Sequence, residues 1–302
     1  MPADQTLWRD TLRGMAAMSV AVSVFAINDA LTKLANLPTG ETMAIRSAIA
    51  GALLFAVIAA SGQLHLFRTL MNRAVVIRTI GDVVATVLFL LALFQIPLSN
   101  ALTIVQVTPL AITAAASVVL REQVGWRRWS AVAAGFLGVV IVVHPGLAGF
   151  QAASLLTLLS VVGITARDLS TRFIPAAVPG LLVTLIASFA NSLAGFGVGL
   201  FETWTPPPAL ALLELLGSGA FLSLGHELTI FAMRHGEMSA IAPFRYVAIP
   251  LAIVLGFLIW GDQPDVFTLI GTALIIAAGV YTFARERALH LAVPGEASLP
   301  DI

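Results

Sequence analysis

Apolar residues fill almost the whole chain and are interrupted at nearly regular intervals by short runs rich in Pro, Gly and charged residues. A helix needs roughly 20 apolar residues to cross about 30 Å of hydrocarbon, and each apolar stretch is close to that length. The pattern therefore predicts an all-α membrane protein with ten transmembrane helices, at approximately residues 13–35, 41–61, 74–95, 98–119, 128–144, 152–172, 178–201, 208–234, 237–260 and 265–284.

The composition supports this prediction. Of the 302 residues, 59% are hydrophobic and 11% are charged, whereas about 25% of the residues in a soluble domain are charged. The net charge of zero gives no support for a nucleic-acid partner. The absence of Cys excludes disulfides, thiolate metal sites and Cys nucleophiles. A full-length apolar span follows the short polar start at once, so we expect that span to be retained rather than cleaved as a signal peptide.

Basic residues collect on every second connection between the predicted spans. Thirteen of the 16 Lys and Arg residues lie at the two termini or on the second, fourth, sixth and eighth connections and their flanks. Because loops rich in Lys and Arg remain in the cytoplasm, both termini are predicted to be cytoplasmic.

Short sequence motifs recur in the two halves of the chain, separated by a nearly constant number of residues. Asp29–Lys33 resembles Asp168–Arg172 at an offset of 139, and Pro109–Ile112 resembles Pro250–Ile253 at an offset of 141. Each half holds five predicted spans, an odd number, so the halves would enter the membrane from opposite faces, as in the inverted repeats of secondary transporters. The predicted division is a first repeat at 1–145, a second at 146–287 and a cytoplasmic tail at 288–302.

Two prolines interrupt predicted spans at equivalent positions. Pro109 cannot donate a backbone hydrogen bond to the carbonyl of Val105, and Pro250 cannot donate one to that of Tyr246. Helices broken at matching positions of two repeats point to a transporter binding site. The alternative is a simple packing kink whose freed backbone groups are satisfied by neighbouring helices.

Polar side chains inside the spans are the candidates for function, because a charge within the bilayer costs a few kcal/mol and usually faces the bundle interior. At about 1.5 Å of rise per residue, several of them lie at similar depths. The candidates for substrate binding are Asp82, Gln106, His226, Glu227, Arg245 and Tyr246. A group nearer the outside is predicted to form a gate or a structural ion pair, and it consists of Asn28, Asp29 and Arg46.

Depth predicts two ion pairs, Glu227 with Arg245 and Asp29 with Arg46. A cavity that carries both signs of charge suits a zwitterionic solute. The guanidinium of Arg245 would bind the carboxylate, and Asp82 or Glu227 would bind the ammonium. The alternative is that these charges are buried ion pairs that hold the bundle together.

Other polar residues have simpler interpretations. Arg78, Arg167 and Asp168 are expected to reach the nearer membrane interface along their flexible side chains. His226 is expected to be hydrogen-bonded, with a proton relay as the alternative. The GxxxG pair Gly195 and Gly199 favours close helix packing. We expect this packing within one bundle and hence a monomer, with a dimer face as the alternative.

A set of short motifs resembles the EamA repeat of the drug/metabolite transporter superfamily. In the first half these are Leu98–Ala101, the Pro109 segment leading to Arg121-Glu122, and Gly138-Val139. The second half carries a similar series: Glu237–Ala240, Pro250, Asp262-Gln263-Pro264 and Gly279. The resemblance implies a ten-helix bundle with an inverted repeat and a central cavity lined mainly by the first, third, fourth, sixth, eighth and ninth helices. It also implies a location in the bacterial inner membrane and a small-molecule substrate.

Enzyme signatures are missing from the sequence. His226-Glu227 is not followed by the second His of a metalloprotease motif, and the single Lys excludes a phosphate-binding GK loop. We expect no cofactor and no metal. The leading hypothesis is an amino-acid exporter that works by alternating access. The alternatives are an uptake carrier for S-adenosylmethionine, riboflavin or another metabolite, and a membrane interaction subunit that transports nothing.

Overall fold

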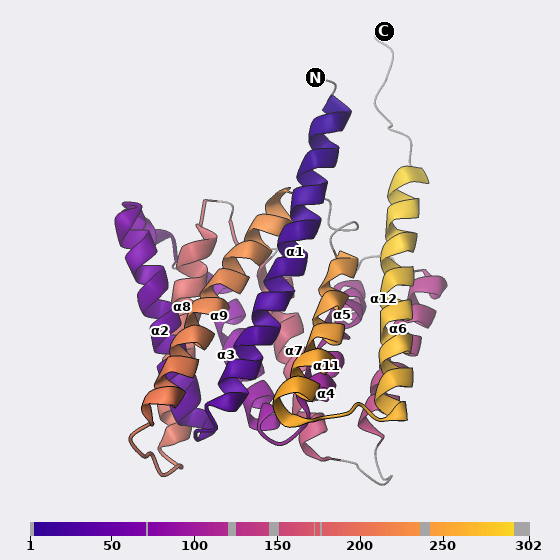
Figure 1. Cartoon of the computed structure of the whole chain (residues 1–302). Helices are drawn as coiled ribbons and strands as arrows, with labels where there is room; N and C mark the ends of the chain where they lie inside the picture. Colours follow the sequence, from indigo (N-terminus) through magenta and orange to yellow (C-terminus); the bar gives the residue numbers. More distant parts are fainter. Residues whose placement is uncertain are drawn as a thin grey trace.

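The computed structural model describes residues 3–70, 72–119, 125–144, 151–171, 173–175, 177–235 and 242–292. The chain is folded as a bundle of helices that run roughly along one axis (Figure 1). Three parts of the sequence prediction lie outside the described residues: the Arg121-Glu122 motif, the Glu237–Ala240 motif and positions 293–302 of the expected tail.

The first half of the chain contains the 3-10 helix η1 (Gln63–Leu70) and six α-helices. They are α1 (Ala3–Leu34), α2 (Thr39–Ala60), α3 (Arg73–Leu93), α4 (Leu98–Val105), α5 (Thr108–Val119) and α6 (Trp126–Val143). The second half contains α7 (Ala153–Thr171), α8 (Gly180–Gly199), α9 (Ala209–His235), η2 (Ala242–Val247), α11 (Ala248–Trp260) and α12 (Val266–Ala292).

Within the described residues, eight helices are long and apolar enough to cross a membrane, by length and composition. Two shorter apolar helices, Trp129–Val143 and Phe244–Trp260, lie where the fifth and ninth spans were predicted. The all-helical class is therefore confirmed, and the chain is a multi-pass membrane protein. The division into ten spans and two repeats stays a prediction.

The prolines explain where two of the spans are interrupted. The predicted span 98–119 consists of α4 and α5, which are separated by Gln106 and Val107 just before Pro109. In the second half, the 3-10 helix η2 gives way to α11 two residues before Pro250. Proline is tolerated in the first turn of a helix, where its missing N–H would have no partner in any case. Each proline therefore begins a new helix rather than bending a continuous one.

Four pairs of helices make the main long-range packing. These are α1 with α9, α2 with α8, α3 with α7, and α6 with α12. Helix α4 also packs against α11. Small residues allow close approach at several of the crossings. At the α2–α8 crossing, a methyl group added to Gly195 would lie 2.8 Å from the carbonyl oxygen of Gly40. The prediction that this glycine motif packs within the bundle is confirmed.

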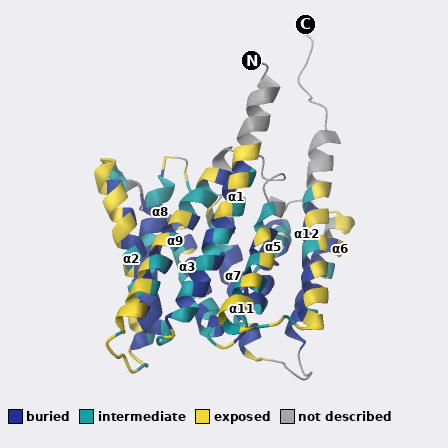
Figure 2. Ribbon diagram, in the orientation of Figure 1, coloured by how far each residue is buried: buried dark blue, intermediate teal, exposed yellow. Residues whose placement is uncertain are grey.

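The outer surface of the bundle is apolar. Leu193 is 73% exposed and Leu258 is 72% exposed, and exposed residues are frequent on the outward faces of the helices (Figure 2). In a membrane such side chains contact lipid, so their exposure needs no partner protein. Polar residues, by contrast, are found among the buried positions, where they build the site described below.

Chain direction defines two ends of the bundle. The beginning of α1 and the end of α12 lie at the same end (Figure 1), which we name the termini end. Helix α3 starts at this end because α1 runs away from it and α2 returns. The opposite end holds the connection between α1 and α2.

Candidate functional site

Asp82, near the middle of α3, has both carboxylate oxygens in hydrogen bonds. Its Oδ1 accepts from Nη1 of Arg167 at 3.1 Å, and its Oδ2 accepts from Nδ2 of Asn191 at 2.7 Å. Nε of Arg167 donates at 2.8 Å to Oδ1 of the neighbouring Asp168. Arg78 lies one helical turn before Asp82 on α3 and therefore on the same face. We name these five residues the Asp82 cluster.

The expectation that Arg78 would reach the membrane interface is wrong, because this residue is only 9% exposed. Arg167 and Asp168 are partly exposed, at 23% and 21% of their side chains. Arg167 also pairs with Asp82 on another helix. Side chains tilt toward the N-terminus of their helix, and Arg167 lies four residues from the C-terminal end of α7, so this tilt directs it toward Asp82.

Tight backbone packing between α3 and α7 holds the pair in place. A methyl group added to Gly81 would lie 2.9 Å from the backbone nitrogen of Arg167. One added to Gly163 would lie 2.8 Å from the backbone nitrogen of Ala85. Both distances are shorter than a carbon atom tolerates, so only glycine allows the two backbones to approach this closely. The approach brings Arg167 within reach of Asp82.

A second polar group, which we name the Asn28 network, joins α1, α2 and α9. Oγ of Ser218 donates to Oδ1 of Asn28 at 2.7 Å, and Nδ2 of Asn28 donates to Oδ1 of Asp29 at 2.8 Å. The hydroxyls of Thr32 and Ser218 lie 2.8 Å apart, and Nη1 of Arg46 donates to Oγ1 of Thr32 at 3.3 Å. Asp29 and Arg46 also interact electrostatically. The predicted gate residues therefore lie together.

Gln106 connects the two interrupted spans. Its Nε2 donates a hydrogen bond to the backbone carbonyl of Arg245 at 3.2 Å, so the break between α4 and α5 contacts the 3-10 helix η2. The carbonyl of Val105, which Pro109 leaves without a backbone partner, accepts a hydrogen bond from the hydroxyl of Thr108. Two of the predicted substrate-binding residues, Gln106 and Arg245, are thus in direct contact.

The other predicted residues have mixed surroundings. His226 is hydrogen-bonded through Nδ1 to the carbonyl of Leu222 at 2.8 Å, as expected, and it interacts electrostatically with Asp82. Arg245 interacts electrostatically with Asp168. The pairing of Glu227 with Arg245 stays a prediction.

Tyr246 differs from the other candidates because it lies in an apolar environment. It is 5% exposed and packs with Ile104, Val107, Ile249 and Ile275. Its role in binding a substrate stays a prediction.

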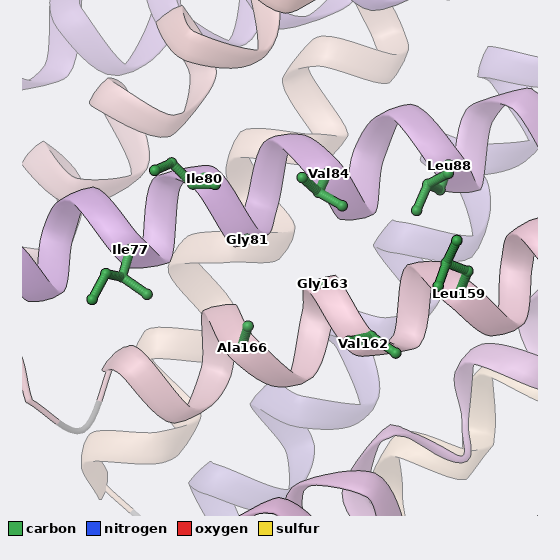
Figure 3. Close-up of a pocket in the computed structure, with 9 residues that line it drawn as sticks. All are labelled: Ile77, Ile80, Gly81, Val84, Leu88, Leu159, Val162, Gly163 and Ala166. Atoms are coloured by element: carbon green, nitrogen blue, oxygen red, sulfur yellow. The ribbon is translucent and has the colours of Figure 1, made fainter. Parts of the chain in front are cut away.

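Two pockets lie away from these residues. An apolar groove of about 380 Å³ runs along the α3–α7 crossing, and Figure 3 shows the side chains of both helices around it: Ile77, Ile80, Gly81, Val84, Leu88, Leu159, Val162, Gly163 and Ala166. Its isoleucines and valines are strongly exposed, so the groove faces lipid. A polar pocket of about 190 Å³ is lined by Pro97, Asn100, His144, Gln151, Gln263, Asp265 and Thr268. None of the predicted substrate-binding residues lines either pocket.

Sequence reasoning missed three residues that complete the polar interior. Asn191 was passed over although it is an amide in an otherwise apolar span, which is a usable signal. Thr32 and Ser218 were passed over because small hydroxyl residues are common in membrane helices and usually bond to their own backbone. Only their contact across helices distinguishes them.

Buried charges and broken spans are features that transporters share. Residues 12–144 match the EamA-like transporter family. The resemblance to EamA transporters that the sequence motifs indicated is confirmed, and the match covers the first half of the chain.

Curated relatives cover more of the chain. A "Riboflavin transporter" of Vibrio cholerae serotype O1 is 26% identical over 276 residues, which are 88% of this chain and 91% of that protein. An "S-adenosylmethionine uptake transporter" of Rickettsia prowazekii is 24% identical over 193 residues, 63% of this chain and 65% of that protein. The latter match spans slightly less than two thirds of the relative.

A solved crystal structure has the same fold. Its TM-score to this chain is 0.65 at 18% sequence identity, and the alignment covers 94% of this chain and 100% of the other. At this identity the likeness concerns the fold alone.

Proposed function

We propose that the chain is a secondary carrier that moves small polar metabolites across the bacterial inner membrane by alternating access. One observation carries this proposal: the polar group nearer the termini end is partly exposed, whereas the polar group nearer the opposite end is buried. The side chains of Arg167 and Asp168 are 23% and 21% exposed. In the Asn28 network, no residue is more than 8% exposed.

Chain order assigns these two groups to opposite ends. Asp82 and Arg167 belong to the half of the bundle nearer the termini end, because α3 begins there and α7, which packs antiparallel to α3, ends there. Thr32 and Arg46 flank the connection between α1 and α2, at the opposite end. This arrangement is what an alternating-access carrier has in one of its two states. By the positive-inside pattern, the open side is the cytoplasm.

Helix packing supports two exchangeable repeats with their boundary near residue 145. We match the helices of the two repeats in chain order. The first repeat, α1, α2, α3, α4–α5 and α6, then corresponds to the second repeat, α7, α8, α9, η2–α11 and α12. Exchanging the halves then turns the α1–α9 contact into the α7–α3 contact, and it returns the α2–α8, α6–α12 and α4–α11 contacts to themselves. A symmetry of this kind lets one structure open to either face with the same set of contacts.

The substrate class follows from the charges. The cluster around Asp82 offers guanidinium, carboxylate and amide groups together, a set that suits a zwitterion. Amino-acid export remains one version of the proposal, and uptake of S-adenosylmethionine or riboflavin is the version that the names of the relatives favour. Those names also favour a carrier over an enzyme.

Transport by purified protein tests the proposal. The full chain is reconstituted in liposomes, and entry and exit of riboflavin, S-adenosylmethionine and a mixture of amino acids are measured with and without a proton gradient. We expect at least one solute to move faster than in empty liposomes. We expect Arg245→Ala and Glu227→Ala to slow that movement, and Arg127→Gln, at an exposed position of α6, to leave it unchanged.

Two results would contradict the proposal. If folded protein moves no solute, the chain is not a carrier of this class, and the interaction-subunit hypothesis takes its place. If a solute moves and both the Arg245 and Glu227 variants transport it at the normal rate, the assigned site is wrong although the carrier function stands.

A further inference from the structure

Arg78 is a buried cation whose donors are largely unused. It is 9% exposed, and its Nε and Nη1 atoms have no hydrogen-bond partner among the groups of the described chain. These two atoms carry three of the five N–H donors of a guanidinium. A buried donor without a partner is costly, and a buried charge more so. Most of the hydrogen-bonding capacity of Arg78 is therefore unused within the described chain.

In the described chain, neither neighbouring acid makes a hydrogen bond with Nε or Nη1 of Arg78. Asp82 accepts from Arg167 on one oxygen and from Asn191 on the other. Asp168 accepts from Nε of Arg167. Both acids act on Arg78 electrostatically, which favours its charged form in this position. The N–H donors on its Nε and Nη1 atoms, however, have no acceptor in the described chain.

Asn191 presents the complementary feature. It is 6% exposed, and its Oδ1 has no partner in the described chain. Its amide nitrogen donates to Asp82, which fixes the orientation of the group and makes the free atom an acceptor. Arg78, with free donors, and Asn191, with a free acceptor, thus both interact with Asp82.

We infer that Arg78 binds a carboxylate of the transported solute while Oδ1 of Asn191 accepts a hydrogen bond from an amino or hydroxyl group of the same molecule. This rests on the proposed carrier function and narrows its substrates to amino acids and related acids. A carboxylate fits better than a phosphate because Arg167 is already bound to Asp82 and Asp168. One guanidinium remains for the solute, and its planar fork matches a singly charged carboxylate.

The cluster is partly exposed near the termini end. The side chains of Arg167 and Asp168 are 23% and 21% exposed, and both residues interact electrostatically with Arg78. We expect a solute to reach Arg78 past these two residues.

Matched pairs of solutes test the inference. The probes are S-adenosylmethionine, L-leucine and L-phenylalanine, each compared with its decarboxylated counterpart, and riboflavin as a solute without a carboxylate. Binding to the purified full chain is measured by thermal shift, which does not require transport. Transport is measured separately in liposomes. The variants are Arg78→Gln, Arg78→Lys and Asn191→Leu, with Arg127→Gln as the control.

We expect at least one of the carboxylates to raise the melting temperature of the wild type, while its decarboxylated counterpart does not. Arg78→Gln should weaken that binding about tenfold or more, as loss of one charge-assisted contact does, and Arg78→Lys should retain part of it. Without ligand, Arg78→Gln should melt no lower than the wild type, because the removed group has unsatisfied donors. A purely structural arginine would give a lower melting temperature.

Each remaining outcome separates this inference from the proposed function. Transport of riboflavin without binding of any carboxylate overturns the inference and leaves the carrier function intact. Carboxylate binding that depends on Arg78 in a protein that transports nothing supports the inference and overturns the carrier function. Undiminished carboxylate binding by Arg78→Gln overturns the inference.

Discussion

The side-chain amide of Gln106 donates a hydrogen bond to the backbone carbonyl of Arg245 at 3.2 Å. The two residues are 139 positions apart, which is close to the offsets of 139 and 141 at which short motifs recur between the two halves. Each lies at the interruption of a span just before a proline. The contact therefore joins equivalent breaks in the proposed repeats, and it ties the α4–α5 break to the 3-10 helix that carries Arg245.

Replacing Gln106 by Leu should loosen this junction. The carbonyl of Arg245 would lose its donor, and a lost hydrogen bond of this kind costs about 1 kcal/mol. We expect a lower melting temperature in detergent and slower transport. Gln95→Leu is the control, because Gln95 is exposed in the turn after α3 and its side chain donates to the carbonyl of Leu91, near the end of that helix. Equal effects of the two substitutions would show that the junction has no special role.

Replacing Asp82 alone should lower the stability of the protein more than replacing Asp82 and Arg167 together. Asp82→Ala leaves Arg167 without one of its two carboxylate partners, and breaking a buried ion pair from one side typically costs about 3–5 kcal/mol. The double variant Asp82→Ala with Arg167→Met should be more stable than Asp82→Ala alone. Melting temperatures of the single and double variants give the coupling between the two residues. Additive losses would contradict a direct interaction.

Glycine at position 81 should be required for the α3–α7 crossing. The methyl group of Gly81→Ala would meet the backbone of Arg167, so the helices must separate, at a cost of about 1–3 kcal/mol. The same substitution at Gly197, where an added methyl group meets nothing within 4 Å, should be neutral or slightly stabilising. The two alanine variants are compared by thermal unfolding. A stable Gly81→Ala protein with unchanged transport would argue against this packing.

Access to the polar interior should differ between its two ends. The chain has no Cys, so a single introduced cysteine reports its own surroundings. A cysteine at Asp168, whose side chain is 21% exposed, should react with a membrane-impermeant thiol reagent, and only from the side of the membrane on which the termini lie. A cysteine at Thr32, which is 0% exposed, should react slowly from either side.

The outcome that would contradict this assignment is rapid labelling at position 32 together with protection at position 168. Inside-out and right-side-out vesicles distinguish the two membrane faces. The same vesicles test the orientation inferred from the arginines, since a cysteine placed beside Arg127 should be reached only from the cytoplasmic side.

The membrane class, the helical spans and the positions of the interruptions follow from the sequence alone. Hydrocarbon cannot form hydrogen bonds with the backbone, so an apolar stretch of about 20 residues that enters the membrane satisfies its own backbone groups by forming a helix. Proline has no N–H to donate, so Pro109 and Pro250 mark breaks wherever they occur in a span. The apolar length of a span and the missing N–H of proline are local properties, so the sequence alone reveals them.

The sequence did not reveal which side chains contact one another across helices. Depth arguments grouped Asp82 with His226 correctly, and they missed the pairing of Asp82 with Arg167 because depth says nothing of the direction in which a long side chain extends. That direction depends on helix polarity, and the pairing depends on how closely Gly81 and Gly163 let two backbones approach. The sequence by itself determined which polar groups enter the membrane. Tertiary packing alone decided which of them neutralise one another and which, like the guanidinium of Arg78, keep donors without a partner in the described chain.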